Sequence, residues 1–147
     1  MKILVINGPN LNFLGSREVE VYGKYDFDYL RQIIMKKCAQ VDVLCELYQS
    51  NHEGAIIDKI QEAYRDITEG IIINPGALAH YSYAIHDAIT SVKIPTVEVH
   101  ISDIETRKEA WRHESVTAPA CVKLIKGKGL DGYLEAIDFL VEYNKNK

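Results

Sequence analysis

The stretch that decides the fold is ILVINGPNLN, residues 3–12. Ile3 to Ile6 is a continuous apolar run, too short for a helix, and it is typical of a strand buried on both faces of a sheet. The run ends at Asn7-Gly8-Pro9, where the proline cannot donate to a β-ladder and restricts the residue before it. Open α/β sheets bind ligands beyond the carboxyl ends of their strands, so a buried strand leading directly into side-chain amides indicates an active site.

Strand and helix patterns alternate along the rest of the chain. Asp26 is a plausible N-cap for the first helix, and Pro95 occupies the tolerated first position of a strand. We expect strands over 3–6, 41–48, 70–73, 95–99 and 122–125, and helices over 26–38, 53–65, 83–91, 104–112 and 130–143. This alternation predicts parallel βαβ units in a flavodoxin-like, doubly wound, five-stranded parallel sheet with three α/β/α layers, and one catalytic domain over 1–147.

Composition restricts the class of protein. The chain has 147 residues, of which 47% are hydrophobic and 26% charged, as expected of a globular domain with a full core. Its net charge of -4 argues against nucleic acid as a partner. No apolar run approaches the length of a membrane span, and Lys2 leads into the first strand without a signal-peptide pattern. The three cysteines lack metal-site spacing, so we expect reduced thiols in a cytoplasmic protein.

Polar side chains collect where the expected strands end. They are Asn7, Asn10 and Asn12 after the first strand, Asn74 and His80 after the third, and His100 and Ser102 after the fourth. Parallel strands present their carboxyl ends at one edge of the sheet, so these residues should converge. A single histidine after a strand is more often a structural residue, but convergence of two histidines with several amides and arginines favours catalysis.

The same loops argue against several common activities. A phospho-accepting receiver domain needs acidic residues where this chain has Asn7 and Asn74. Neither glycine-rich pattern of a dinucleotide or phosphate site occurs, and the loop after the first strand is not the Ser/Thr-rich loop of a flavin site. His80 and His100 have no neighbouring acidic pair that would complete a metal site. We therefore expect acid/base chemistry without a cofactor or metal, on a small, polar, anionic substrate.

Several short blocks resemble a known family. They are NGPNLN at 7–12, RE at 17–18, YG at 22–23, QSNHEG at 49–54, INPGA at 73–77, VEVHIS at 97–102 and GYL at 132–134. Together and in this order they resemble the type II 3-dehydroquinate dehydratases. The resemblance implies a flavodoxin-like fold, a homododecamer built as a tetramer of trimers, and the cofactor-free removal of water from 3-dehydroquinate in the shikimate pathway.

The resemblance also implies catalytic roles. Tyr22 matches the base that removes a proton alpha to the ketone, which requires its pKa to fall from about 10 by roughly 2 to 3 units. Arg17 is the cation that would stabilise the phenolate. Asn12 matches a residue that holds a water at the enolate oxygen, and His100 matches the acid that protonates the leaving hydroxyl. Glu98 points to the same strand face as His100 and would orient it.

Substrate recognition is implied for Asn74, His80, Asp87, Ile101, Ser102 and Arg112. The backbone amides of Ile101 and Ser102, at the start of the expected short helix, suit a carboxylate. The guanidinium of Arg112 can donate to vicinal hydroxyls.

The chain departs from the family pattern in three places, one of which is His86, where an arginine is common before Asp87. Leu78-Ala79 stands where most members have Tyr-Thr, and four residues instead of three separate Arg107 from Arg112. In a helix, the extra residue rotates one arginine by about 100° relative to the other. These departures leave an alternative open, namely a non-catalytic small-molecule-binding or scaffolding member of the same fold.

Overall fold

A computed structural model of the chain describes residues 1–16, 20 and 25–147. At its centre lies an all-parallel sheet with the strand order β2-β1-β3-β4-β5, which confirms the expected flavodoxin-like topology. The strands are β1 (Lys2–Asn7), β2 (Leu44–Gln49), β3 (Gly70–Asn74), β4 (Thr96–His100) and β5 (Lys123–Lys126).

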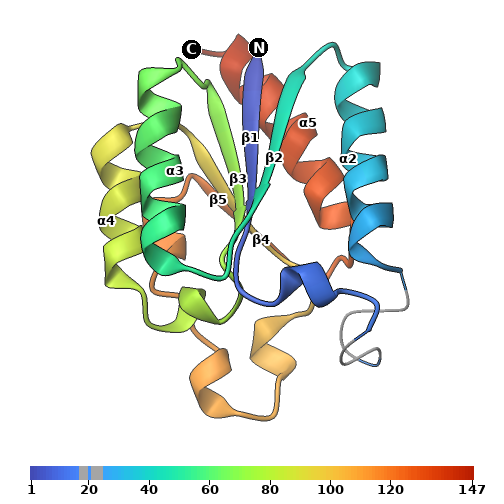
Figure 1. Cartoon of the computed structure of the whole chain (residues 1–147), viewed down its shortest axis with the longest axis vertical. Helices are drawn as coiled ribbons and strands as arrows, with labels where there is room; N and C mark the ends of the chain where they lie inside the picture. Colours follow the sequence, from blue (N-terminus) through green and yellow to red (C-terminus); the bar gives the residue numbers. More distant parts are fainter. Residues whose placement is uncertain (17–19, 21–24) are drawn as a thin grey trace.

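Two pairs of helices cover the two faces of the sheet (Figure 1). On one face lie α2 (Phe27–Gln40) and α5 (Asp131–Lys145), and on the other α3 (Glu53–Arg65) and α4 (Tyr83–Val92). Alternate strand residues point to opposite faces, so Ile3 and Val5 join one apolar cluster while Leu4 and Ile6 join the other. None of the helices that the structure describes is long and apolar enough to cross a membrane.

Local side-chain chemistry determines where several elements begin. Asp26 is the N-cap of α2, as expected, and its carboxylate accepts from the backbone N–H of Tyr29 at 2.8 Å. Ser82 caps α4 in the same way. The strand expected from Val41 begins only at Leu44, because Val41 ends α2 and Asp42 has a positive φ of 58° that turns the chain.

The prediction of a single helix over 104–112 is wrong. The structure has two separate 3₁₀ turns, η3 (Ile104–Thr106) and η4 (Ala110–Arg112). Arg107 is extended at φ -70° and ψ 150°, and the Thr106 hydroxyl donates back to the carbonyl of Asp103 at 2.7 Å. Such local bonds compete with helix propagation. Because the segment is not one helix, the extra residue does not rotate Arg112 by about 100° relative to Arg107.

Candidate active site

The loops after β1 and β3 are in direct contact. Asn7 and Asn74 are paired in register at the ends of these strands, and the N–H of Gly8 donates to the carbonyl of Asn74 at 2.8 Å. A Cβ on Gly8 would collide with the carbonyl of Pro75, and Gly76 has φ +61°. Glycine is thus required at both positions, because the two loops must cross closely to form one floor.

A buried tyrosine from the last helix orients both strand-end asparagines. The hydroxyl of Tyr133 donates to Oδ1 of Asn7 at 2.6 Å and accepts from Nδ2 of Asn74 at 2.9 Å. Oδ1 of Asn74 accepts from the N–H of Gly76 at 3.1 Å. Burial raises the pKa of Tyr133 above its usual range, so the hydroxyl keeps the proton that it donates. Tyr133 entered the sequence argument only as part of the resemblance, and its supporting role comes from the structure.

Replacing Tyr133 by phenylalanine should lower stability and weaken substrate binding together. The change leaves Oδ1 of Asn7 and Nδ2 of Asn74 buried without their partner, at a cost of about 1–3 kcal/mol. We expect a lower urea midpoint at fixed protein concentration and a higher KM. The control is Tyr143→Phe on the exposed side of the same helix, which should change neither quantity. An unchanged midpoint for Tyr133→Phe would show that the network contributes nothing.

A polar cavity of about 120 Å³ lies beyond the carboxyl ends of β1, β3 and β4. The carboxyl ends of these strands lie at the end of the sheet from which η3 and η4 project, away from both chain termini (Figure 1). The cavity brings together Asn74, His80, His100, Ile101, Ser102 and Arg112 among the residues expected from the sequence, and its other lining residues are Pro9, Asn10, Leu11, Gly76, Ala77, Ile104 and Arg107. Of the strand-end residues expected to converge, Asn10, Asn74, His80, His100 and Ser102 line this cavity, and Asn7 and Asn12 do not.

His100 is held from behind by a buried carboxylate. Nε2 of His100 lies 2.7 Å from Oε2 of Glu98, and both side chains are buried. A carboxylate only accepts, so Nε2 must carry a hydrogen, and Nδ1 is the nitrogen left for a ligand. Ser115 donates to Oε2 of Glu98 at 2.6 Å, and the hydroxyl of Thr117 donates to Oε1. These donors fix the carboxylate and, through it, the tautomer and ring orientation of His100.

His80 forms the neighbouring wall of the cavity. Its ring centre lies 6.4 Å from that of His100, and its Nδ1 lies 2.7 Å from the carbonyl oxygen of Glu114. A carbonyl only accepts, so Nδ1 carries the proton and Nε2 of the neutral ring is an acceptor. Burial lowers the pKa of His80, and the charges of His100 and Arg112 lower it further. His80 is therefore neutral near pH 7 and can accept a hydrogen bond from a substrate hydroxyl.

Both arginines reach the cavity despite the extra residue between them. Only 19% of the Arg112 side chain is exposed. Its Nε lies 3.2 Å from Oε2 of Glu109, and its Cζ lies 4.1 Å from the ring centre of Trp111. The 3₁₀ turn η4 directs Arg112 into the cavity from outside the sheet.

Several expected residues do not line the cavity. Asn12 is exposed on the turn η1 (Leu11–Phe13), with its Oδ1 3.5 Å from Nε2 of Gln49. Asp87 lies on α4 with 82% of its side chain exposed, 3.2 Å from Nδ1 of His86. Tyr22 and Arg17 lie outside the residues that the structure describes.

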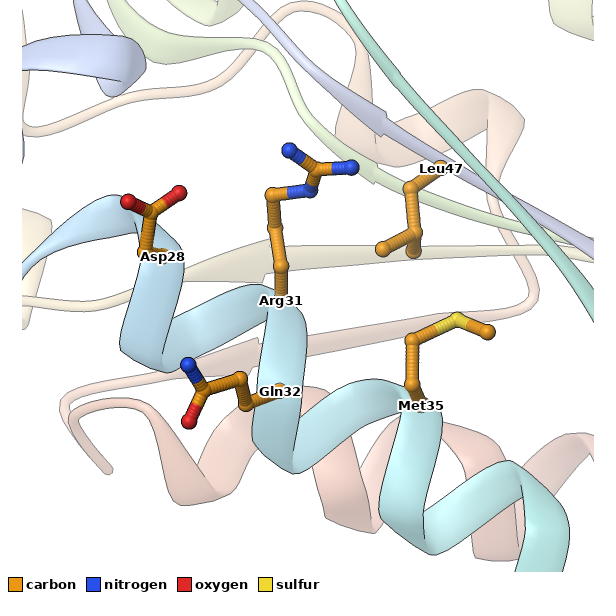
Figure 2. A pocket seen from close by; sticks show the side chains of 5 residues that line it. All are labelled: Asp28, Arg31, Gln32, Met35 and Leu47. Atoms are coloured by element: carbon orange, nitrogen blue, oxygen red, sulfur yellow. The ribbon is translucent and has the colours of Figure 1, made fainter.

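A larger hollow, of about 690 Å³, lies between α2 and β2 (Figure 2). The side chains of Arg31 and Met35 rise from α2 toward the strand that carries Leu47, and Asp28 and Gln32 complete the lining. It lacks the convergence of strand-end histidines and amides that marks the smaller cavity. We therefore place the active site at the smaller cavity.

The part of the chain that the structure describes offers few groupings of possible metal ligands. It contains no cluster of three or more histidine, cysteine or carboxylate side chains arranged for a metal ion. Cys38, Cys45 and Cys121 are free thiols, as expected.

The chain is similar over nearly its whole length to proteins of one family. The sequence model of the family described as "Dehydroquinase class II" matches residues 1–141. The chain is 57% identical over 144 residues to a 3-dehydroquinate dehydratase of Lachnoclostridium phytofermentans, covering 98% of this chain and 99% of that one. The type II dehydroquinase of Butyrivibrio crossotus superposes with a TM-score of 0.94 at 59% identity, covering 96% of this chain and 97% of that one. That of Propionibacterium acnes superposes with a TM-score of 0.91 at 38% identity, covering 96% of each chain. The chain therefore belongs to the class II dehydroquinase family.

Proposed function

We propose that this protein is a lyase that dehydrates 3-dehydroquinate to 3-dehydroshikimate by cofactor-free acid/base elimination through an enolate. The observation that carries the proposal is the buried Glu98–His100 pair at the wall of a polar cavity, because a purely binding site needs no oriented acid. The alternative of a non-catalytic binding or scaffolding protein is not favoured by relatives that are themselves named 3-dehydroquinate dehydratase.

The reaction divides between two sides of the substrate. Tyr22, activated by Arg17, removes the proton alpha to the ketone, and a water held by Asn12 stabilises the enolate oxygen. The enolate then expels the beta hydroxyl, which takes a proton from Nδ1 of His100 and leaves as water. Glu98 keeps Nε2 of His100 protonated, so that Nδ1 is the nitrogen that delivers the proton.

The cavity polarity suits a hydroxylated carboxylate. Asn74 and neutral His80 offer hydrogen-bond partners to hydroxyls, and Arg112 contributes a fixed fork of donors. The backbone at Ile101 and Ser102 lies at the same wall and is proposed to bind the carboxylate. Asp87 is proposed as a further substrate contact on the basis of the resemblance alone.

A direct assay tests the function. The purified protein is mixed with 3-dehydroquinate in buffer containing EDTA, and the conjugated-enone absorbance of the product is followed. We expect this absorbance to rise at the same rate with and without EDTA, and borohydride added with substrate should not inactivate the enzyme. Substrate binding without product formation would favour the non-catalytic alternative. Loss of activity in EDTA would contradict the cofactor-free mechanism.

We expect a cytoplasmic homododecamer with no nucleic-acid or membrane partner. The family resemblance implies the twelve chains, and the exposed aromatic side chains of Phe13, Tyr81 and Tyr83, in the segments that follow β1 and β3, are available for contacts between them. Light scattering should therefore give a mass near twelve chains of 16.7 kDa each. A single 16.7 kDa species would contradict this assembly.

A further inference from the structure

Trp111 is the only tryptophan of the chain, and its ring touches two residues of the cavity wall. The Arg112 guanidinium carbon lies over the ring, 4.1 Å from its centre. The ring of His80 meets it edge to face, at 5.5 Å between ring centres and an interplanar angle of 80°. Trp111 is itself 54% exposed and does not line the cavity, so it can act only through these neighbours.

We propose that Trp111 is a positioning residue for substrate recognition, which holds the Arg112 guanidinium and the His80 ring at the cavity wall. The inference rests on the proposed function, because the ligand concerned is the substrate of that reaction. Trp111 lies in the four-residue segment between Arg107 and Arg112, where most members of the family have three residues, so the proposal gives this segment a function.

The position of Arg112 explains why it needs such a support. It ends a three-residue 3₁₀ turn that lies outside the sheet, so its backbone is held by local bonds such as its N–H to the carbonyl of Glu109 at 2.9 Å. The Arg112 side chain is long and rich in rotamers, and ordering it on substrate binding opposes affinity. A tryptophan face is the best aromatic partner for a guanidinium, and stacking limits the rotamers in advance.

Glu109 places a competing charge beside the same guanidinium. Its Oε2 lies 3.2 Å from Nε of Arg112, and 49% of its side chain is exposed. Trp111 covers the face of the guanidinium instead of its edge, which leaves edge N–H groups available to a ligand. The ring contact with His80, whose Nδ1 is fixed on the Glu114 carbonyl, ties this arrangement to the β3 side of the cavity.

The test compares Trp111→Ala with Trp111→Phe by KM and kcat for 3-dehydroquinate. Loss of an exposed cation–π contact corresponds to roughly a 2- to 5-fold change in affinity, so Trp111→Ala should raise KM by about that factor and leave kcat nearly unchanged. Trp111→Phe keeps a smaller aromatic face and should restore part of the affinity. The control is Tyr64→Ala on α3, an aromatic residue with 66% exposure that lies outside the cavity lining, and its KM should stay at the wild-type value.

A double-mutant cycle then tests whether Trp111 acts through Arg112. In an Arg112→Ala background, Trp111→Ala should raise KM far less than it does in the wild type, because the group that it positions is gone. An equal rise in both backgrounds would overturn the proposal, as would an unchanged KM for Trp111→Ala. A changed assembly mass for Trp111→Ala by light scattering would assign the effect to the interface and would also overturn it.

Fluorescence of the ligand-free protein tests the contact without any activity. Because Trp111 is the sole tryptophan, its emission reports this one ring, and Arg112→Ala should change its intensity or wavelength. Identical emission in the wild type and Arg112→Ala would show that the contact is absent and would overturn the proposal. If the wild type shows no dehydratase activity while the emission does respond, the proposed function fails and the contact itself stands.

Discussion

Tyr22→Phe should lower kcat for 3-dehydroquinate by roughly 10²–10⁴-fold, while KM changes far less. The substitution removes the phenolic oxygen that accepts the substrate proton and keeps the aromatic ring. Tyr22 lies outside the residues that the structure describes, so the expectation comes from the match of Tyr22-Gly23 to the family. Steady-state kinetics by enone absorbance measure both constants. Normal turnover by Tyr22→Phe would move the base to another residue.

Variants of Arg17 test whether this residue activates Tyr22. Arg17→Ala should cause a similar loss and raise the apparent basic pKa of the pH–rate profile, since the phenolate loses its neighbouring cation. Arg17→Lys should recover only part of the activity, because a point charge replaces a rigid fork. The Tyr22→Phe, Arg17→Ala double variant should be little worse than either single variant if the two act as one unit. Strictly additive losses would assign them separate roles.

Glu98→Gln should lower kcat by about 10²-fold or more, as expected when a general acid loses its orientation. The amide keeps the shape of the side chain, but its NH₂ group only donates. Of the groups that now donate to the carboxylate, namely His100, Ser115 and Thr117, those that face the NH₂ group lose their acceptor. Where the NH₂ group faces Nε2 of His100, Nε2 must accept a hydrogen bond, so the neutral ring takes the Nδ1–H tautomer and the doubly protonated ring that acts as the acid is disfavoured. The variant should also unfold at a lower urea concentration, since buried donors lose their acceptor.

Two further variants separate orientation from general damage. Ser115→Ala removes one donor to Glu98 and leaves His100 in contact with it, so the loss in kcat should be much smaller than for Glu98→Gln. Glu46→Gln neutralises a partly exposed glutamate on β2 and should leave kcat unchanged. A Glu98→Gln enzyme with wild-type kcat would show that His100 needs no carboxylate partner.

The positions of the strands along the chain were predictable from the local sequence. Ile3 to Ile6 and Ile71 to Ile73 are apolar on both faces because they are central strands of a sheet covered by helices on both sides. Helix starts were predictable where a side chain caps the backbone, as at Asp26. These signals lie within a few residues of what they determine.

The side-chain pattern predicted the wrong element boundaries where the backbone adopts a conformation that interrupts a strand or helix. The β2 boundary moved because of the positive φ at Asp42, and the segment 104–112 broke into two turns because Arg107 is extended. Neither residue type requires these conformations. They depend on the turns that return the chain to the sheet edge.

By itself, the sequence determined the sheet, its parallel order and the edge at which polar residues gather, because each of these follows from side-chain pattern and from the geometry common to parallel strands. It also supplied His100 and Glu98 as a pair, since alternate strand residues share a face. Only the tertiary structure decided which groups support them. Thr117 and Tyr133 reach the site across 19 and 126 residues of chain, and no periodicity or spacing relates residues so far apart. Their contacts exist because the helices and turns pack on the sheet, and packing is set by the whole core.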